Sequence, residues 1–231
     1  AIKNATVDGI IGMGLEFGKE VQEALKRRKL PFVCIDAIDE ENIVSVSIDN
    51  EGAAEMQMRE ALEHGHRNIS IISLPGAAYL DEDRDPDVAP GVAEARNRGY
   101  EKARKIFGID KAFPTYPVLA TFEGGEEAAA KIIEDNRTTC IVTMSDIQAA
   151  GAIRYLERNG YRVPEDISVI GFDGIFRDTW GKKLCTIDQQ GQLKGKKAAE
   201  ILFEIIKGND PQETISLIPF SFVEGETLKS M

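Results

Sequence analysis

The sequence contains no apolar run long enough to cross a bilayer, which would take about 20 residues. Its first residues, Ala1 to Thr6, show no basic segment followed by an apolar one, as a secretory signal peptide would. We therefore expect a cytoplasmic protein that has no membrane partner.

Cysteine is scarce, and the three present are an odd number, Cys34, Cys140 and Cys185. Cys34 and Cys140 lie inside apolar runs that are typical of strands. We expect buried, reduced thiols that act as small apolar side chains, which suits a reducing cytoplasm better than disulfides or metal ligands.

Positive charge is in deficit, because 28 Lys and Arg stand against 39 Asp and Glu and give a formal net charge of -11. A duplex-binding surface needs clustered cations that neutralise phosphates and release counterions. We therefore expect this stretch of chain to bind DNA poorly by itself.

Catalytic and cofactor motifs are also missing. The two histidines, His64 and His66, flank Gly65 without ligands at metal-site spacing. Gly12-Met13-Gly14 lacks the third glycine of the dinucleotide fingerprint, and neither a phosphate-binding loop nor a Gly-x-Ser-x-Gly elbow occurs. The sequence predicts no enzyme, no metal and no cofactor.

What is present is an alternation of short apolar runs with longer segments of helical periodicity. The 231 residues, 42% of them hydrophobic, fit one large domain or two lobes. The runs predict strands at 7–11, 31–36, 43–48, 69–74, 116–120, 139–143, 167–172 and 185–187, and a final extended stretch at 215–223. The periodic segments predict helices at 15–28, 51–64, 93–107, 126–134, 147–158 and 193–206. Nearly all-apolar strands between helices indicate an α/β fold with parallel sheets covered on both faces.

One segment, Ala77 to Glu94, breaks this alternation with acidic residues and prolines, and it predicts a long loop. Two interpretations remain open. A solvated surface excursion is favoured, and a flap beside a ligand-binding mouth is the alternative.

Polar residues follow several predicted strands, and ligands of open parallel sheets bind beyond the carboxyl ends of strands. The candidate ligand-binding residues are Asp36, Arg96, Phe122, Ser145, Asp146, Asp173 and Gln189. A sugar needs such a mixture, because each hydroxyl both donates and accepts a hydrogen bond, while an aromatic face covers the ring.

Four of these side chains have a capping role as an alternative of about equal weight. Ser145 and Asp146 suit the N-cap of the helix that follows them, and Asp36 and Asp173 suit caps of turns. The convergence of several such residues at strand ends favours a binding site over separate caps.

Four segments resemble the LacI/GalR family of transcription regulators. They are Leu62–Ile69, Arg96–Tyr100, Val163–Asp173 and Thr186–Gln189. The first contains Gly-His-Arg, and the third reads Val-Pro-Glu-Asp-Ile-Ser-Val-Ile-Gly-Phe-Asp. They occur in the family's order, and the resemblance extends from about Val7 to Thr227.

The resemblance implies two Rossmann-like lobes joined by three crossovers, with a small effector bound in the cleft. We expect the amino-terminal lobe at 1–47 and 188–218, and the carboxy-terminal lobe at 48–187 and 219–231. The family's helix-turn-helix headpiece and the first two strand–helix units of the amino lobe have no counterpart in this sequence. We therefore expect an incomplete amino lobe and a longer parent protein.

The resemblance also assigns roles to site residues. Arg96 and Asp173 resemble the two main effector-binding residues, and Gln189 falls at the last crossover. Asp36 falls on the amino-lobe side, and Phe122 matches an aromatic wall. Ser145 replaces the family's usual Asn before Asp146, which removes an amide from the expected site.

Function follows from the same resemblance. We expect the core of a repressor or activator that binds a sugar-like effector, with nucleosides and purines as alternatives. Operator DNA would be bound through the absent headpiece and the protein would be a homodimer. Leu15–Leu25 and Leu193–Ile206 are candidate interface helices, and burial against their own sheet is the alternative for both. The rival functions are a periplasmic solute-binding protein and an enzyme on a nucleotide-binding lobe.

Overall fold

A computed structural model describes residues 7–13, 27–36, 43–75, 91–134, 137–176, 178–211 and 213–231. The chain forms two compact units. The first holds the described residues up to Asp49, residues 91–92, and those from Gln190 to Pro219, and the second holds the remainder. Of the predicted helix 15–28, only the last two residues are described, and both are helical. Residues 77–90 of the predicted loop 77–94 lie outside the described residues. The predicted end of the loop at Glu94 is wrong, because a helix already begins at Val92.

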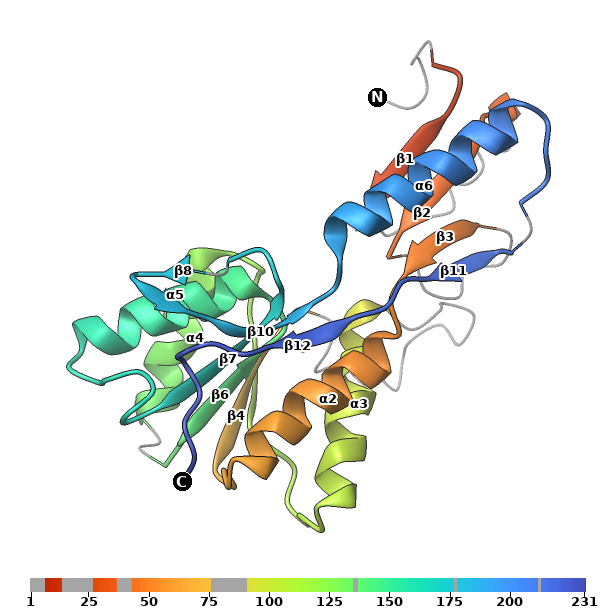
Figure 1. Ribbon diagram of the computed structural model, residues 1–231. Coiled ribbons are helices and arrows are strands. Elements are labelled where there is room, and N and C mark those ends of the chain that lie inside the picture. The colour runs from red at the N-terminus through yellow and green to blue at the C-terminus, as the bar shows by residue number, and fades with distance from the viewer. Residues whose placement is uncertain are drawn as a thin grey trace. The chain divides into compact units, whose positions relative to one another are not determined.

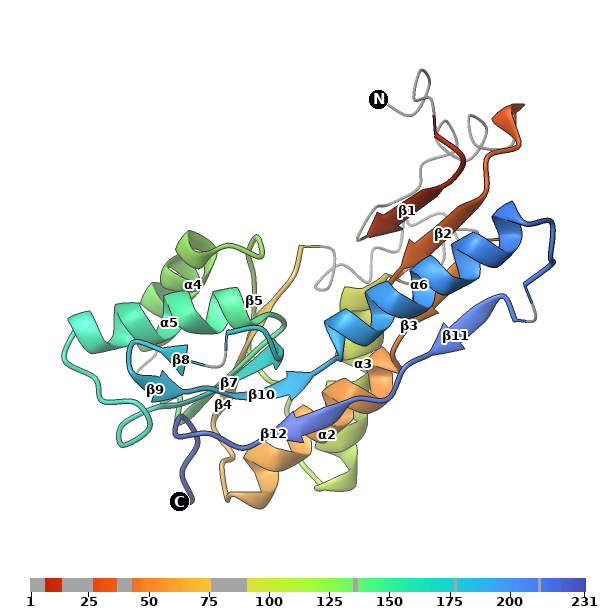
Figure 2. The ribbon, with the colours of Figure 1, turned by 45° about the horizontal axis from the view of Figure 1, so that its top comes forward.

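The first unit contains a four-stranded, fully parallel sheet in the order β1-β2-β3-β11. Its strands are β1 (Ile10–Met13), β2 (Phe32–Ile35), β3 (Val44–Ser47) and β11 (Ile215–Leu217). Helix α6 (Gly191–Ile206) packs along β2 and β3 (Figure 2) and buries Lys194 and Ala198. The strand predicted at 7–11 begins three residues later, where Ile10 pairs with Phe32 beyond Pro31.

The second unit contains a six-stranded sheet in the order β12-β10-β7-β6-β4-β5. Its strands are β4 (Ile69–Ser73), β5 (Thr115–Pro117), β6 (Cys140–Thr143), β7 (Ser168–Asp173), β10 (Cys185–Asp188) and β12 (Ser221–Val223). All pair in parallel except β12, which runs antiparallel to β10 at the edge. Every residue of β4 and β6 is buried, which explains their nearly continuous apolar sequence.

Helices cover both faces of this sheet (Figure 1). Helices α2 (Asn50–Glu63) and α3 (Val92–Ile106) lie on one face, and α4 (Phe122–Glu134) and α5 (Asp146–Arg158) lie on the other. Helix α4 begins four residues before its predicted start, because Thr121 Oγ1 accepts the Gly124 N–H (3.0 Å) and forms its first turn. Gly125 and Gly151 are needed for packing, since a Cβ at either would collide with the backbone of the facing helix.

The predicted extended stretch 215–223 is divided between the two units, because β11 joins the first unit's sheet and β12 joins the second unit's. The pattern of apolar runs did not indicate that β12 is antiparallel to its neighbour, because strand direction depends on where the chain turns back.

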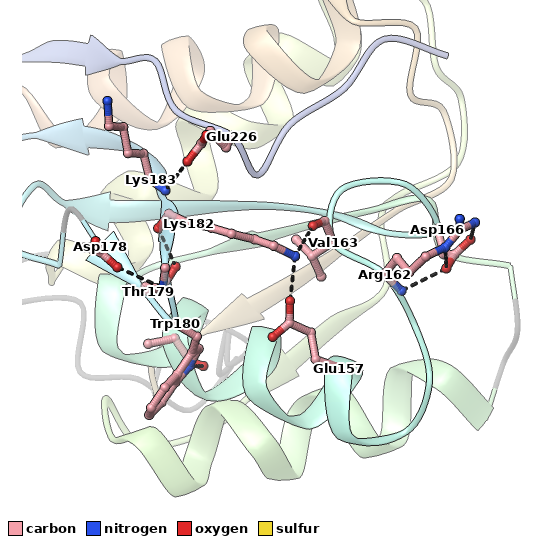
Figure 3. Close-up of polar contacts among 12 residues, drawn as sticks. Glu157, Arg162, Val163, Asp166, Asp178, Thr179, Trp180, Lys182, Lys183 and Glu226 are labelled. Carbon is pink, nitrogen blue, oxygen red and sulfur yellow. Dashed lines mark hydrogen bonds and ion pairs between the residues drawn. The ribbon is translucent and has the colours of Figure 1, made fainter.

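A two-stranded hairpin was missed altogether. Strands β8 (Asp178–Thr179) and β9 (Lys182–Lys183) are joined by Trp180 and Gly181, both at positive φ (56° and 81°), as tight hairpin turns require. Figure 3 shows Lys182 pointing from the hairpin towards α5. Its Nζ donates to Glu157 on that helix (2.6 Å) and to the carbonyl of Val163, which follows the helix (2.5 Å). Strands of two residues are too short for a hydrophobic pattern to reveal.

Among the described residues, no helix is both long enough and apolar enough to cross a membrane. The three cysteines are free and buried, as predicted. Burial raises the pKa of the Cys140 thiol far above its ordinary value, which keeps it protonated and unreactive.

Candidate functional site

The candidate site lies at the carboxyl edge of the second unit's sheet, where β6, β7 and β10 end side by side. Ser145 and Asp146 follow β6, Asp173 ends β7, and Gln189 follows β10. Because neighbouring parallel strands end at the same edge, residues far apart in the sequence meet here.

Arg96 reaches this edge from the second turn of α3 and is only 4% exposed. Its Nε donates to Asn50 Oδ1 (3.1 Å), and its Nη1 donates to the Met144 carbonyl (2.5 Å). The guanidinium lies 3.6 Å above the centre of the Phe172 ring, a close cation–π contact. Arg96 is therefore a fixed, buried cation just before the carboxyl ends of β6 and β7.

Asp173 carries the carboxylate at the end of β7. Its Oδ1 accepts from Gln189 Nε2 (2.5 Å), and its Oδ2 accepts from the Asp146 backbone N–H (3.2 Å). Burial raises the pKa of Asp173 to about 6; Arg96 opposes this rise, and the Asp146 carboxylate adds to it. Its backbone φ of 141° is unfavourable for a residue with a side chain, and such strain is concentrated at functional sites.

Asp146 is fully buried, and its oxygens are held within the protein. Oδ1 accepts from Thr186 Oγ1 (2.5 Å), while Oδ2 accepts from the N–H groups of Ile175 (2.8 Å) and Phe176 (3.0 Å). Burial raises the pKa of Asp146 despite these hydrogen bonds. Asp146 thus fixes the backbone that follows Asp173.

Ser145 is the N-cap of α5, and its Oγ accepts the Gln148 N–H (3.3 Å). The capping interpretation is confirmed for Ser145, and its contact with a ligand stays a prediction. Ser145 is 6% exposed, so little of its surface is accessible at this edge.

Phe122, the predicted aromatic wall, opens α4. Its ring packs edge-on against Trp180 at 5.9 Å between centroids, and Arg154 lies 4.4 Å above the Trp180 ring. These contacts lie along α5 and do not include Arg96 or Asp173. The ligand contact expected of Phe122 therefore stays a prediction.

Asp36 belongs to the first unit, where it follows β2 at a positive φ of 63°. Both of its oxygens accept from Lys194 Nζ (2.8 and 2.7 Å), and Oδ1 also accepts from Ser47 Oγ (3.2 Å). Lys194, whose side chain is 4% exposed, lies in the first turn of α6. Its pairing with Asp36 was not foreseen.

Sequence reasoning also missed the partners that hold Arg96: Asn50, Met144 and Phe172. Phe172 lies within the Val163–Asp173 motif, so its position in the strand could be read from the sequence, but its contact with Arg96 could not. A further buried network was missed, in which Tyr100 donates to Gln57 Oε1 (2.7 Å) and Gln57 Nε2 donates to the Gly171 carbonyl (2.6 Å). This network ties α2 and α3 to β7 close to the site.

Within the described ranges, no three His, Cys, Asp or Glu side chains are grouped as a metal ion would require. The arrangement instead offers one guanidinium, an amide and carboxylates around a strand end. Two α/β units with mainly parallel sheets, one of which carries this cluster at its carboxyl edge, define the structural class of the chain.

The comparisons with known proteins agree with this class. A family model described as periplasmic binding protein-like domain matches residues 58–228, so this chain belongs to that family. The sequence is 31% identical to the HTH-type transcriptional repressor PurR of Vibrio atlanticus over 235 residues, which cover 97% of the chain and 65% of that repressor. The chain therefore spans just under two thirds of that relative.

Solved structures show the same fold. A LacI-family transcriptional regulator from Corynebacterium glutamicum superposes with a TM-score of 0.82 at 27% identity, over 98% of this chain and 69% of that one. A LacI-family regulator from Enterococcus faecium with bound ribose superposes with a TM-score of 0.84 at 24% identity, over 97% of this chain and 81% of that one. The fold is that of the effector-binding domain of LacI-family regulators, as the sequence motifs predicted.

Proposed function

We propose that this chain is the effector-binding and dimerisation core of a LacI-type transcription regulator. The effector is a small polar ligand, most simply a sugar, and it controls DNA binding by a helix-turn-helix headpiece elsewhere in the protein. The observation that carries the proposal is the cluster of Arg96, Asp173 and Gln189 at one sheet edge. The bound ribose of the Enterococcus faecium neighbour supports a sugar as the ligand.

Each side chain of the cluster has a chemical task in this proposal. Arg96 supplies fixed N–H donors, and Asp173 supplies a carboxylate that accepts hydrogen bonds from hydroxyls. Gln189 orients that carboxylate through its 2.5 Å hydrogen bond. Ionised Asp173 accepts more hydrogen bonds than the neutral acid does, so affinity should rise as the pH passes about 6.

Regulation requires that the effector bind two states of the protein with different affinities. In a dimer of such cores, a change of state would alter the spacing of two headpieces on operator DNA. The relatives named as transcription regulators favour this function over the periplasmic solute-binding protein and the enzyme considered from the sequence.

Calorimetric titration at pH 7.5 tests the proposal with ribose, cellobiose, free nucleosides and purines. Arg96→Lys should weaken binding of the recognised compound by about 100-fold, because a lysine lacks the planar fork and the stacking surface. Arg98→Ala is the matched control, since Arg98 lies on the same helix with a 44% exposed side chain paired to Glu51.

Gln189→Ala is a second variant that leaves the buried guanidinium intact. It should weaken binding about tenfold by releasing the Asp173 carboxylate. Unchanged affinity in both variants would overturn the proposed site, and no binding by any compound of the panel would overturn the proposed ligand class.

A further inference from the structure

Arg96 and Asp173, the two residues proposed to bind the effector, each contact a residue at a crossing between the two units. Within the described ranges, the chain crosses from one unit to the other at 49–50, 92–93, 189–190 and 219–220. Asn50 follows the first crossing, and its Oδ1 accepts from Arg96 Nε (3.1 Å). Gln189 precedes the crossing at 189–190, and its Nε2 donates to Asp173 Oδ1 (2.5 Å). All four residues belong to the second unit, so these contacts lie within one compact body.

Asn50 connects Arg96 to the crossing at 49–50. It is the first residue of α2 and is only 3% exposed, so its hydrogen bond to the guanidinium is shielded from water. A hydrogen bond from a charged donor is stronger than one between neutral groups, and a buried acceptor that loses its donor is destabilised. Because Asn50 directly follows the crossing, a displacement of Arg96 acts on the chain at that point.

Gln189 connects Asp173 to the crossing at 189–190 through two hydrogen bonds. Besides the side-chain bond, the Gln189 backbone N–H donates to the Asp173 carbonyl (3.4 Å). On the other side of the crossing, Gln190 has a φ of 53° and a ψ of 48°, a left-handed conformation that is unfavourable for a residue with a side chain. Strain of this kind persists only where the surrounding structure holds the backbone, and the bonds to Asp173 immediately precede it.

The crossing at 219–220 is connected to Asp173 through the sheet. Asp173 is the register partner of Asp188 on β10, and Asp188 is the register partner of Ser221 on β12. The ends of β7 and β10 approach so closely that a Cβ at Gly174 would lie 2.7 Å from the Asp188 Cα. Because such close packing transmits displacements, a shift of the Asp173 backbone acts on β10 and on the start of β12.

An effector bound to Arg96 and Asp173 acts on the same groups that hold these crossings. Its hydrogen bonds polarise and shift the guanidinium and the carboxylate, so the bonds to Asn50 and Gln189 change when the site is filled. Any change at the crossings that the effector favours must in turn alter effector affinity by the same factor.

We infer that Asn50 and Gln189 are coupling residues, through which occupation of Arg96 and Asp173 changes the backbone at the crossings at 49–50 and 189–190. This inference rests on the proposed function, because Arg96 and Asp173 are the residues proposed to bind the effector. It goes further by assigning the first step of the response to two hydrogen bonds.

Hydrogen exchange followed by mass spectrometry tests the inference on the wild type with saturating ribose, cellobiose, adenosine or adenine. For each compound that calorimetry shows to bind, exchange of the amides at 48–53 and 188–191 should change by about threefold or more. A compound that binds and leaves both segments unchanged overturns the inference, although the proposed function stands. If none of the four compounds binds, the proposed ligand class fails, and the Asn50 variants decide the coupling in the ligand-free protein.

Asn50→Leu and Asn50→Asp separate the hydrogen bond from the size of the side chain. Leucine removes the acceptor of Arg96 and aspartate retains it, so ligand-free exchange at 48–53 should rise about tenfold in Asn50→Leu alone. Equal exchange in the two variants overturns the inference, because the acceptor then does not hold the crossing. Arg98→Ala is the matched control, since Arg98 joins α3 to Glu51 of α2 through an exposed ion pair. Its exchange at 48–53 should stay within about twofold of wild type.

Gln189→Ala tests the second contact. Ligand-free exchange at 188–191 should rise about tenfold and exchange at 48–53 should stay unchanged, because each hydrogen bond holds its own crossing. A joint rise at both segments in this variant or in Asn50→Leu overturns the inference, because the unit is then loosened as a whole. With a compound bound, Asn50→Leu should lose the response at 48–53 and keep the response at 188–191. A purely structural role for Asn50 would leave both responses in place.

Discussion

Asp173 shows how one residue joins the fold to the candidate site. Its backbone ends β7 in a conformation that costs energy, and its carboxylate caps the first N–H of α5 from a neighbouring strand. Burial makes the charged form unfavourable, so the same residue destabilises the folded state while it supplies a hydrogen-bond acceptor. Such a conflict is expected where function, and not stability, selects the residue.

The pH dependence of stability should reveal this conflict. The folded protein binds a proton at Asp173 with a pKa of about 6, whereas the ordinary value is 3.8. Folding therefore takes up a proton between these values, and the contribution of Asp173 to stability falls as the pH rises from about 4 to above 6. Urea unfolding at several pH values should show that the free energy of unfolding of the wild type falls by up to about 3 kcal/mol relative to that of Asp173→Asn across this pH range.

The free energy of unfolding of Asp178→Asn should instead change with pH as that of the wild type does, because Asp178 is exposed. A constant difference between wild type and Asp173→Asn from pH 4 to 7 would show that the Asp173 carboxylate is not destabilised in the fold.

At the scale of elements, helix packing depends on glycines that the sequence pattern leaves unexplained. Gly151 on α5 faces the Phe122 carbonyl on α4, and Gly125 on α4 faces the Gln148 carbonyl on α5. The two helices therefore approach backbone to backbone. This close approach sets where Phe122 begins α4 and where Ser145 caps α5, both at the edge that carries the site.

Gly151→Ala should destabilise the protein by roughly 2 to 3 kcal/mol, because the added methyl group overlaps a backbone carbonyl that cannot move without displacing a helix. Gly195→Ala in α6 is the matched control, since a Cβ there meets nothing within 4 Å. The free energy of unfolding of the control variant should rise by up to about 1 kcal/mol, because alanine has a higher helix propensity than glycine. Urea unfolding of both variants measures the difference, and an equal response would refute backbone contact between α4 and α5.

At the scale of the whole molecule, net charge determines how strongly this stretch of chain is attracted to DNA. The net charge of -11 repels the phosphate backbone of DNA. We expect fluorescence polarisation to show binding to duplex DNA no tighter than about 100 μM in 0.1 M salt. Micromolar binding that weakens with salt would mean that a basic surface exists on the folded core.

The sequence by itself determined the fold class, because apolar strands and periodic helices recur in an order that permits parallel sheets. It also determined the family, since Val163–Asp173 and the segment around Gly65 are specific motifs. It located Asp173 and Gln189 at strand ends, where parallel topology alone brings residues together, and it placed Arg96 near the start of a helix.

Only the tertiary structure decided what these side chains contact. The stacking of Arg96 on Phe172, the pairing of Asp36 with Lys194 and the antiparallel return of β12 all join residues that are distant in the chain. Hydrophobic periodicity reports which face of an element is buried, but it carries no information about the partner across that face. Contacts of this kind depend on how the elements are packed, and the charge balance of the site follows from them.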